Sequence, residues 1–177
     1  MATVSGASRR YAQALFSLAR DQGKLDEWFG QLQRAASLFQ IPEAEQALTS
    51  PAVDAATKQA LLDRALPDLD EPVRRLLRIL NGRGRLELVP EILSVYQRLL
   101  YEHRNVAVAQ VVTAFPLGAE EQRLVAERLA RYLGKQVVIE PEVDPAIIGG
   151  VVARVDDLLL DDSVRGRLAR LRRALVG

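Results

Sequence analysis

The stretch IIGGVVARVDDLLLDDSVRGRLARL, residues 147–171, decides how the last quarter of the chain folds. Gly149 and Gly150 interrupt a run of β-branched residues, and such a glycine pair inside a strand pattern marks a bulge or the close approach of another backbone. AIIGGVVARV at 146–155 and LLL at 158–160 predict two strands that pair as a hairpin across Asp156 and Asp157.

The same stretch then turns from acidic to arginine-rich. Asp162 and Ser163 predict the N-terminal cap of a final helix over residues 163–175. Its apolar residues form one narrow stripe, so its arginines face outward. The stripe consists of Val164, Leu168, Leu171 and Leu175, and the arginines are Arg165, Arg167, Arg170, Arg172 and Arg173.

Upstream of this stretch, valine-rich segments alternate with an amphipathic one. NVAVAQVVTAF at 105–115 and KQVVIEPEV at 135–143 predict strands, and residues 118–133 predict a helix between them. Strand, helix and strand in this order indicate a parallel βαβ unit. Residues 106–177 are therefore expected to form a small α/β domain with a three- to four-stranded sheet and two helices.

The first part of the chain has a different pattern. Apolar residues recur at spacings of three and four, and glycine or proline separates the periodic segments, which predicts about six helices with short links. The breaks fall at Gly23, Pro42, Pro51, Pro67, Pro72 and the NGRGR loop at 81–85. Residues 1–105 are thus expected to form a six-helix bundle, and the fold class is α+β overall.

Composition excludes several kinds of protein. The 177 residues include 24 basic and 23 acidic side chains, so the chain as a whole has no strong positive potential that would attract nucleic acid. It has no cysteine, which excludes disulfides and metal sites with thiolate ligands. The N-terminal segment lacks a secretory signal pattern, and no apolar run reaches the roughly 20 residues that span a bilayer. The expected location is cytoplasmic, with any membrane association peripheral.

No group of residues suggests chemistry. His103 is the single histidine, no serine lies in a nucleophile-elbow sequence, and the acidic pairs lack the spacing of a calcium loop. We therefore expect no catalytic residue, no metal site and no cofactor. The chain is predicted not to be an enzyme.

The first helix carries the most unusual pattern. Its apolar positions cover an arc of about 200°, roughly twice the width that one core requires. The helix over residues 73–80 is broad as well. Burial at the centre of a bundle explains both arcs, and a groove that accepts an amphipathic helix of a partner explains them equally.

Four segments together resemble the delta subunit family of bacterial ATP synthase, the relatives of the mitochondrial oligomycin-sensitivity-conferring protein. They are RRYAQALFSLA at 9–19, the junction NGRGRLELVPEILSVYQRLLYEHRNV at 81–106, VVTAFPL at 111–117 and VDPAIIGGVVARVDDLLLDDSVRGRLARL at 143–171. The last is the most specific. The chain departs from the family pattern at Asp156 and Asp157, where Gly-Asp is common, and at Asp162, where glycine or an aromatic residue is frequent.

This resemblance implies a non-catalytic stator subunit of the rotary proton-translocating synthase, bound peripherally at the cytoplasmic side of the bacterial inner membrane. It implies that the helical domain binds the N-terminal helix of an alpha subunit and that the second domain binds the C-terminal region of the b-subunit stalk. The expected groove residues are Ala7, Tyr11, Ala14, Leu18, Leu76, Leu77 and Leu80, and the expected signature of the second domain is Gly149, Gly150, Asp161 and Ser163.

An RNA-binding helical adaptor is the alternative from another class, with Arg83, Arg85 and the C-terminal arginines as its contacts. A salt titration distinguishes the RNA-binding hypothesis from the stator hypothesis. Affinity for nucleic acid falls steeply as salt is added, whereas an apolar helix-in-groove contact responds little.

Overall fold

The computed structural model describes residues 5–155 and 157–176, and its contacts divide the chain into two compact units, residues 1–100 and 101–177. The sequence pattern places this boundary at residue 105, where the β-branched segment begins. The division falls slightly earlier, within the helix Val89–His103. Each unit has its own hydrophobic core.

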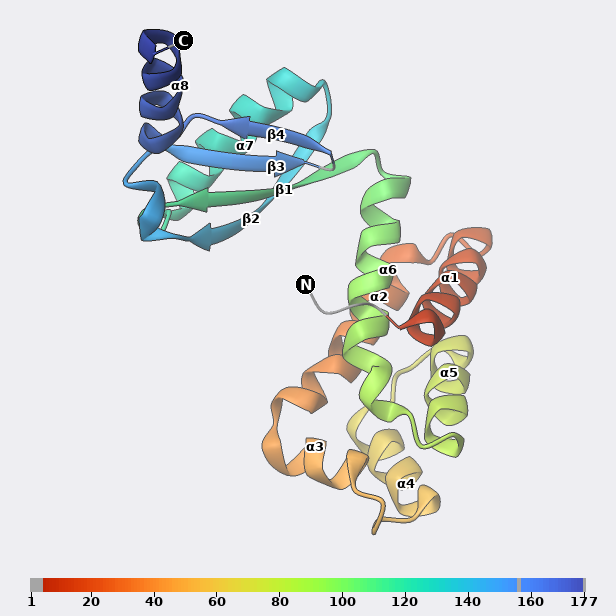
Figure 1. Ribbon diagram of the computed structural model, residues 1–177. Coiled ribbons are helices and arrows are strands. Elements are labelled where there is room, and N and C mark those ends of the chain that lie inside the picture. Colours follow the sequence, from red (N-terminus) through yellow and green to blue (C-terminus); the bar gives the residue numbers. More distant parts are fainter. Residues whose placement is uncertain (1–4, 156, 177) are drawn as a thin grey trace. The chain divides into compact units, whose positions relative to one another are not determined.

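The first unit is helical in every long element (Figure 1). Pro42 and Pro72 stand at the first positions of their helices, where a missing N–H costs nothing. The helices are α1 (Gly6–Asp21), α2 (Leu25–Ser37), α3 (Pro42–Thr49), α4 (Ala55–Ala65), α5 (Glu71–Gly82) and α6 (Val89–His103), with short 3-10 turns at Leu38–Gln40 and Leu86–Leu88.

One face of α1 packs into the core of this unit. Ala12 and Ala19 are fully buried, and Leu15 lies between them on the same face. Their small size lets neighbouring helices approach closely, and two large side chains, Trp28 and Tyr96, fill the centre and are also fully buried. This face explains only half of the wide apolar arc of α1.

A polar contact lies within that buried face. Ser8 is fully buried, and its Oγ donates a hydrogen bond to Glu91 Oε2 of α6 at 2.6 Å. The backbone N–H of Ser5 donates to the other carboxylate oxygen of Glu91. These bonds, that of Ser8 first, hold the pKa of Glu91 below its usual range. A serine is tolerated in the core here because its hydroxyl has a partner.

A second polar cluster ties α2 to the start of α5. Lys24 Nζ and Trp28 Nε1 both donate to Asp70 Oδ2 at 2.8 Å, and the backbone N–H of Asp70 donates to Gln31 Oε1 at 2.9 Å. The hydrogen bond from Lys24 is the largest cause that holds the pKa of Asp70 below its usual range, followed by that from Trp28. The cluster fixes the segment that leads into α5.

The second unit contains a four-stranded mixed sheet in the order β2-β1-β3-β4. The strands are β1 (Val106–Thr113), β2 (Gln136–Val143), β3 (Val151–Val155) and β4 (Leu158–Asp161), and the helices are α7 (Ala119–Leu133) and α8 (Val164–Val176). β1 runs parallel to β2, with Val106 opposite Gln136, and antiparallel to β3. The βαβ unit, the β3–β4 hairpin and the α+β class are confirmed, while Asp156 of the turn lies outside the described residues.

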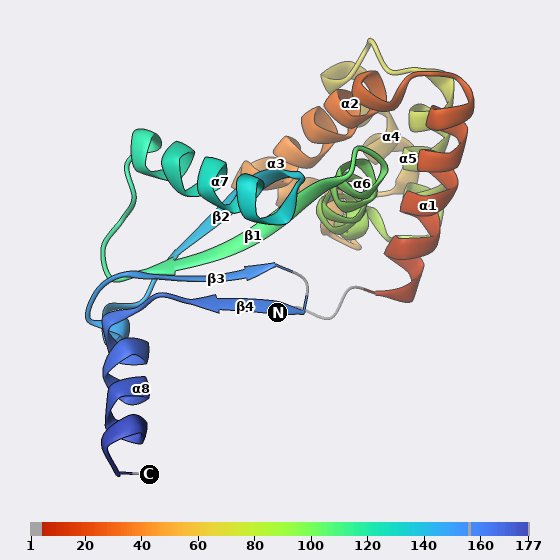
Figure 2. The ribbon, with the colours of Figure 1, turned by 90° about the horizontal axis from the view of Figure 1, so that it is seen from above.

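The two helices of this unit relate differently to the sheet. Alternate residues of β1 are buried, and α7 lies across one face with Leu129 in the core (Figures 1 and 2). In both views α8 extends away from the sheet. Its apolar stripe is consequently exposed at Val164, Leu168 and Leu171, and Leu175 lies outside the described side chains.

One strand prediction is wrong at its start. The pattern AIIGGVVARV predicts a strand from residue 146, but β3 begins only at Val151. Asp144 Oδ1 accepts a hydrogen bond from the backbone N–H of Ala146 at 2.9 Å, and Pro145 opens a short 3-10 turn over Pro145–Ile147. This local turn competes with the strand, so the glycine pair lies in a bend before β3 and not inside it.

The Asp70 cluster predicts an acid-sensitive first unit. Because the folded-state pKa of Asp70 is depressed, its contribution to stability is present above the unfolded pKa of about 4 and is lost as pH falls through the folded value. We expect Asp70→Asn to lower the urea midpoint at pH 7 and to reduce its fall between about pH 5 and pH 2, measured by Trp28 fluorescence. Asp68→Asn is the matched control, since Asp68 is exposed. Equal acid sensitivity in wild type and Asp70→Asn would contradict this role.

Candidate functional site

Helices α1 and α5 lie side by side in opposite directions. Tyr11, near the start of α1, bonds to Arg83 just after the end of α5, and Lys24, just after α1, bonds to Asp70 just before α5. Two contacts at opposite ends fix this antiparallel alignment. By the same alignment Leu18 lies level with Leu76, and Ala14 lies level with Ile79 and Leu80.

The outer side of this pair is apolar. Residues 7, 11, 14 and 18 share one face of α1 by helical spacing. This face adjoins the buried one, and Tyr11 packs against the edge of the core. Leu18 is 49% exposed, Ala14 is exposed, and Ile79 on α5 is 41% exposed. We name the surface made by Ala7, Tyr11, Ala14, Leu18 and Ile79 the α1–α5 face.

The structure distributes the seven predicted groove residues over two environments. Ala7 and Tyr11 are half-buried on the α1–α5 face, beside the exposed Ala14 and Leu18. Leu76 is 7% exposed, while Leu77 and Leu80 are 1% and 0% exposed and lie in the core of the unit. Leu76, Leu77 and Leu80 therefore all belong to the core of the unit, and Ile79, which the sequence did not single out as a site residue, is the exposed large apolar residue of α5.

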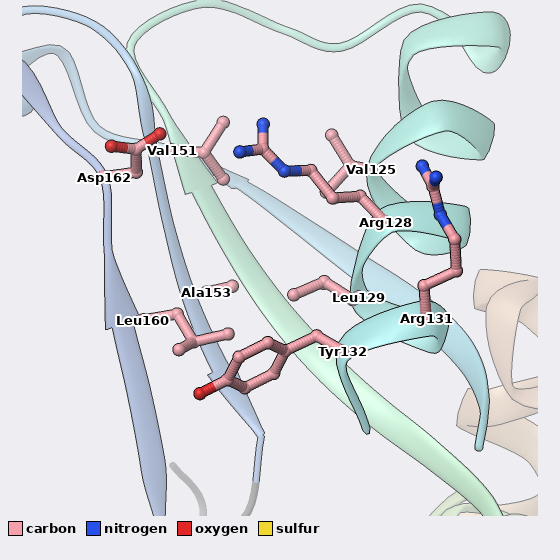
Figure 3. Close-up of a pocket in the computed structure, with 9 residues that line it drawn as sticks. All are labelled: Val125, Arg128, Leu129, Arg131, Tyr132, Val151, Ala153, Leu160 and Asp162. Atoms are coloured by element: carbon pink, nitrogen blue, oxygen red, sulfur yellow. The ribbon is translucent and has the colours of Figure 1, made fainter. Parts of the chain in front are cut away.

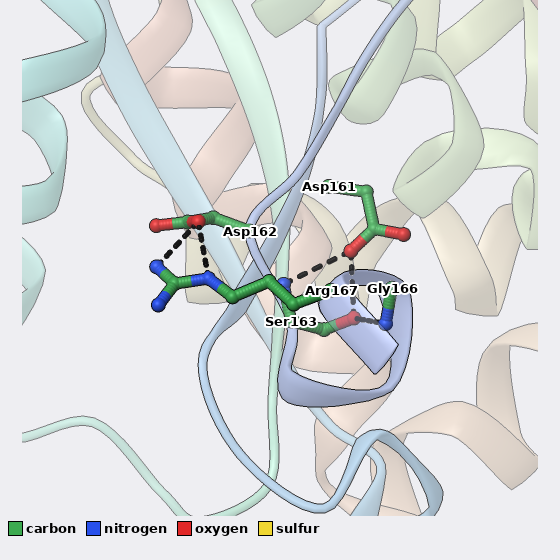
Figure 4. A network of polar contacts seen from close by, with 5 residues as sticks. All are labelled: Asp161, Asp162, Ser163, Gly166 and Arg167. Carbon is green, nitrogen blue, oxygen red and sulfur yellow. Dashed lines mark hydrogen bonds and ion pairs between the residues drawn. The ribbon is translucent and has the colours of Figure 1, made fainter. Parts of the chain in front are cut away.

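In the second unit, two of the signature residues, Asp161 and Ser163, lie in a compact turn between β4 and α8 (Figure 4). Asp161 Oδ1 accepts hydrogen bonds from the N–H and the Oγ of Ser163 at 2.9 Å and 2.6 Å. Ser163 Oγ accepts from the N–H of Gly166 at 2.9 Å, which caps the first turn of α8. The Ser163 cap is confirmed, and these bonds hold the pKa of Asp161 below its usual range.

Asp162 has a different role from the predicted cap. Its Oδ1 pairs with Arg167 Nη2 at 2.6 Å, and this bond is the main cause of its lowered pKa. Asp161, the neighbouring carboxylate, packs against the helix start: a Cβ on Gly166 would lie 2.4 Å from Asp161 Oδ2. The position therefore requires glycine as long as Asp161 stays in place.

Gly150 completes the turn from the other side. Its φ of +82° lies in the region that L side chains rarely adopt, and an added Cβ would lie 2.5 Å from the carbonyl oxygen of Asp162 and 2.9 Å from Ser163 Cα. Gly149 differs, since its Cβ would meet only Val164 Cγ2 at an ordinary 3.5 Å. The expected close approach of a backbone thus occurs at Gly150, and it joins the bend before β3 to the start of α8.

An open cavity of about 640 Å³ lies between α7 and the β3–β4 hairpin. Figure 3 shows Leu129 and Tyr132 of α7 reaching toward Ala153 and Leu160 of the strands. Tyr132 is exposed at the mouth. The remaining lining residues are Val125 and Val151, which are apolar, and Arg128, Arg131 and Asp162, which are charged.

No arrangement for chemistry is found in the part of the chain that the structure describes. Its His, Cys, Asp and Glu side chains do not gather in groups of three or more that could hold a metal ion. Across the same residues, every helix is too short or too polar to cross a bilayer. Arg165, Arg167, Arg170 and Arg172 of α8 are exposed, as predicted, and the side chain of Arg173 lies outside the described ones.

Comparisons of sequence and of structure both match nearly the whole chain to known proteins. The family model described as ATP synthase delta (OSCP) subunit matches residues 7–175. The chain is 36% identical over 176 residues to an ATP synthase subunit delta of Marinobacter nauticus, covering 99% of each, and 34% identical over 173 residues to that of Desulfotalea psychrophila, covering 96% of each. A chain of the Toxoplasma gondii mitochondrial ATP synthase hexamer shares the fold with a TM-score of 0.70 at 24% identity, covering 98% of this chain and 99% of that one.

The turn at Gly150 generates a stability prediction. Gly150→Val should destabilise the second unit by about 1 to 3 kcal/mol or more, because the new side chain collides with the backbone of Asp162 and Ser163 at a positive φ. Gly149→Ala is the control and should cost much less. Two-step thermal unfolding followed by circular dichroism is the measurement, and the transition of the first unit should not move. A Gly150→Val protein as stable as wild type would show that the turn is not packed as described.

Proposed function

The chain belongs to the ATP synthase delta (OSCP) family, and from this premise we propose that it is a non-catalytic stator subunit that links the catalytic head to the peripheral stalk. A link of this kind keeps the head from turning with the central shaft, so that rotation is coupled to ATP synthesis. The subunit would sit peripherally at the cytoplasmic side of the bacterial inner membrane, held there by its partners.

The first contact in this proposal is the α1–α5 face, which would bind the N-terminal helix of an alpha subunit. The observation that carries it is the second apolar face of α1: Leu18 and Ala14 stay exposed although the helix already buries Ala12, Leu15 and Ala19. An apolar strip between two helices matches the way an amphipathic helix docks, with anchors at every third or fourth residue.

The second contact would be made by the unit of residues 101–177 with the C-terminal region of the b-subunit stalk. The cavity beside α7 supports this assignment, because its apolar lining is open to solvent. The Gly150 turn supports it further, since it holds α8 at a fixed starting point next to Asp162, which lines the cavity.

Two binding sites on one chain suit a stator. When one contact opens under load, the other keeps the released partner at a high local concentration, so that it rebinds before the complex separates. This gain requires two independent surfaces, and the division into two compact units provides room for both.

The alpha contact predicts a sharp effect of charge at Ala14. Ala14→Glu should weaken binding of a synthetic alpha N-terminal peptide on the order of 100-fold, because docking would bury an unpaired carboxylate. Calorimetric titration of the full chain measures it, with circular dichroism and the urea midpoint as checks of folding. Gln13→Glu is the matched control on an exposed position of the same helix and should bind normally. Wild-type affinity in folded Ala14→Glu would exclude the α1–α5 face.

The division of labour predicts the behaviour of a fragment. Residues 1–105 contain α1 to α6 and the core of the first unit, so this fragment should fold, bind the alpha peptide with the affinity of the full chain and fail to bind a soluble b-subunit fragment. Titrations with both ligands are the measurement. Binding to b alone, or to both ligands, would reverse the assignment.

A further inference from the structure

Arg83 makes an unusual contact at one end of the α1–α5 face. Its Nη1 donates a hydrogen bond of 2.6 Å to the phenol oxygen of Tyr11, which is 72 positions away in the sequence. Arg83 is exposed and stands just after α5. Its partner carries no charge, and the described residues include no carboxylate in ion-pair distance of the guanidinium.

Charge around the α1–α5 face is mainly positive. Arg10 on α1 and Arg75 on α5 flank it by helical spacing, and Arg83 stands at one end. At the opposite end stand the carboxylates of Asp21, Asp70 and Glu71, which already pair with Arg20, Lys24 and Arg78. A basic rim around an apolar strip favours a partner helix that carries acidic side chains.

We propose that Arg83, held in place by Tyr11, pairs with one acidic side chain of the docking helix and so selects the register and direction of that helix. This inference rests on the proposed function of the α1–α5 face. Arg83 is then the specificity-determining residue, and Tyr11 is a positioning residue that acts through it. The phenol oxygen accepts from Arg83 and still has its own proton to donate to the partner.

The cost of covering an unpaired charge explains how Arg83 can select the register of the docking helix. An apolar strip alone lets an amphipathic helix shift by one turn or reverse at little cost, because the anchors recur at every turn. A guanidinium covered by the docked helix must find an acceptor, since a covered charge without one is costly. A carboxylate at one position of the partner satisfies it in one register, and in the other registers the guanidinium is left unpaired.

The test is a double-mutant cycle on the full chain. The probes are the wild-type alpha N-terminal peptide and a set in which each Asp or Glu is changed singly to Asn or Gln. The variants are Arg83→Gln, Arg83→Lys and Tyr11→Phe. Arg78→Gln is the matched control, because Arg78 is an exposed arginine of α5 that pairs with Glu71.

We expect Arg83→Gln to weaken the wild-type peptide about three- to tenfold, and one peptide substitution to cause the same loss in wild type and none in Arg83→Gln. Tyr11→Phe should give a smaller loss and weaken the same coupling, while Arg78→Gln should change neither. Circular dichroism checks the folding of each variant, and the peptide substitutions alone test the pair on the unchanged protein.

The possible failures are distinct. If Arg83→Gln binds like wild type while Ala14→Glu does not bind, this inference is overturned and the proposed function stands. If Arg83→Gln weakens all peptides equally, the acceptor is not an acidic side chain, and the selection of register is overturned. If Ala14→Glu binds like wild type as well, the α1–α5 face is not the site, and both proposals fall.

Discussion

The double use of α1 is the constraint on which the rest of the structure depends. A helix of sixteen residues buries Ser8, Ala12, Leu15 and Ala19 in the core, and the same packing turns the face of Leu18 outward. The two faces cannot move independently, because they belong to the same α-helix. Any change that rotates α1 in the core would also displace the surface proposed for the alpha subunit. Stability of the first unit and partner binding are therefore coupled through this helix.

In the second unit, backbone geometry at Gly150 sets the position of the last helix. Gly150 brings the bend before β3 against the start of α8, and the Asp161 carboxylate holds Ser163 at the cap of that helix. The turn thus sets where α8 begins and where Asp162 stands at the cavity. This use explains why so much of the recognisable sequence lies between residues 143 and 171, a segment whose described side chains form no group that could hold a metal ion. The residues of this segment determine how the bend before β3 packs against the start of α8.

Periodicity predicted the helical first part, the βαβ unit and the hairpin, because each depends on local patterns of apolar residues. Two of the misses depend on contacts made in the folded unit, and the third depends on a local turn. The partner of Ser8 is Glu91, and no local pattern joins residues 83 positions apart. Ile79 was absent from the predicted site because it lies in the same apolar arc of α5 as Leu76, Leu77 and Leu80, and the sequence does not show that it alone of the four is exposed. The late start of β3 follows from Asp144 and Pro145, whose turn signal was outweighed by the β-branched run.

As a stator link, one chain would hold two partners at the same time. The direct measurement is a titration of the full chain, already saturated with the alpha N-terminal peptide, with a soluble b-subunit fragment, followed by analytical ultracentrifugation. We expect a complex of one copy of the chain, one alpha peptide and the b fragment. The bound peptide should not lower the affinity of the chain for the b fragment. Release of the alpha peptide as b binds would contradict this expectation, because the two partners would then share one surface.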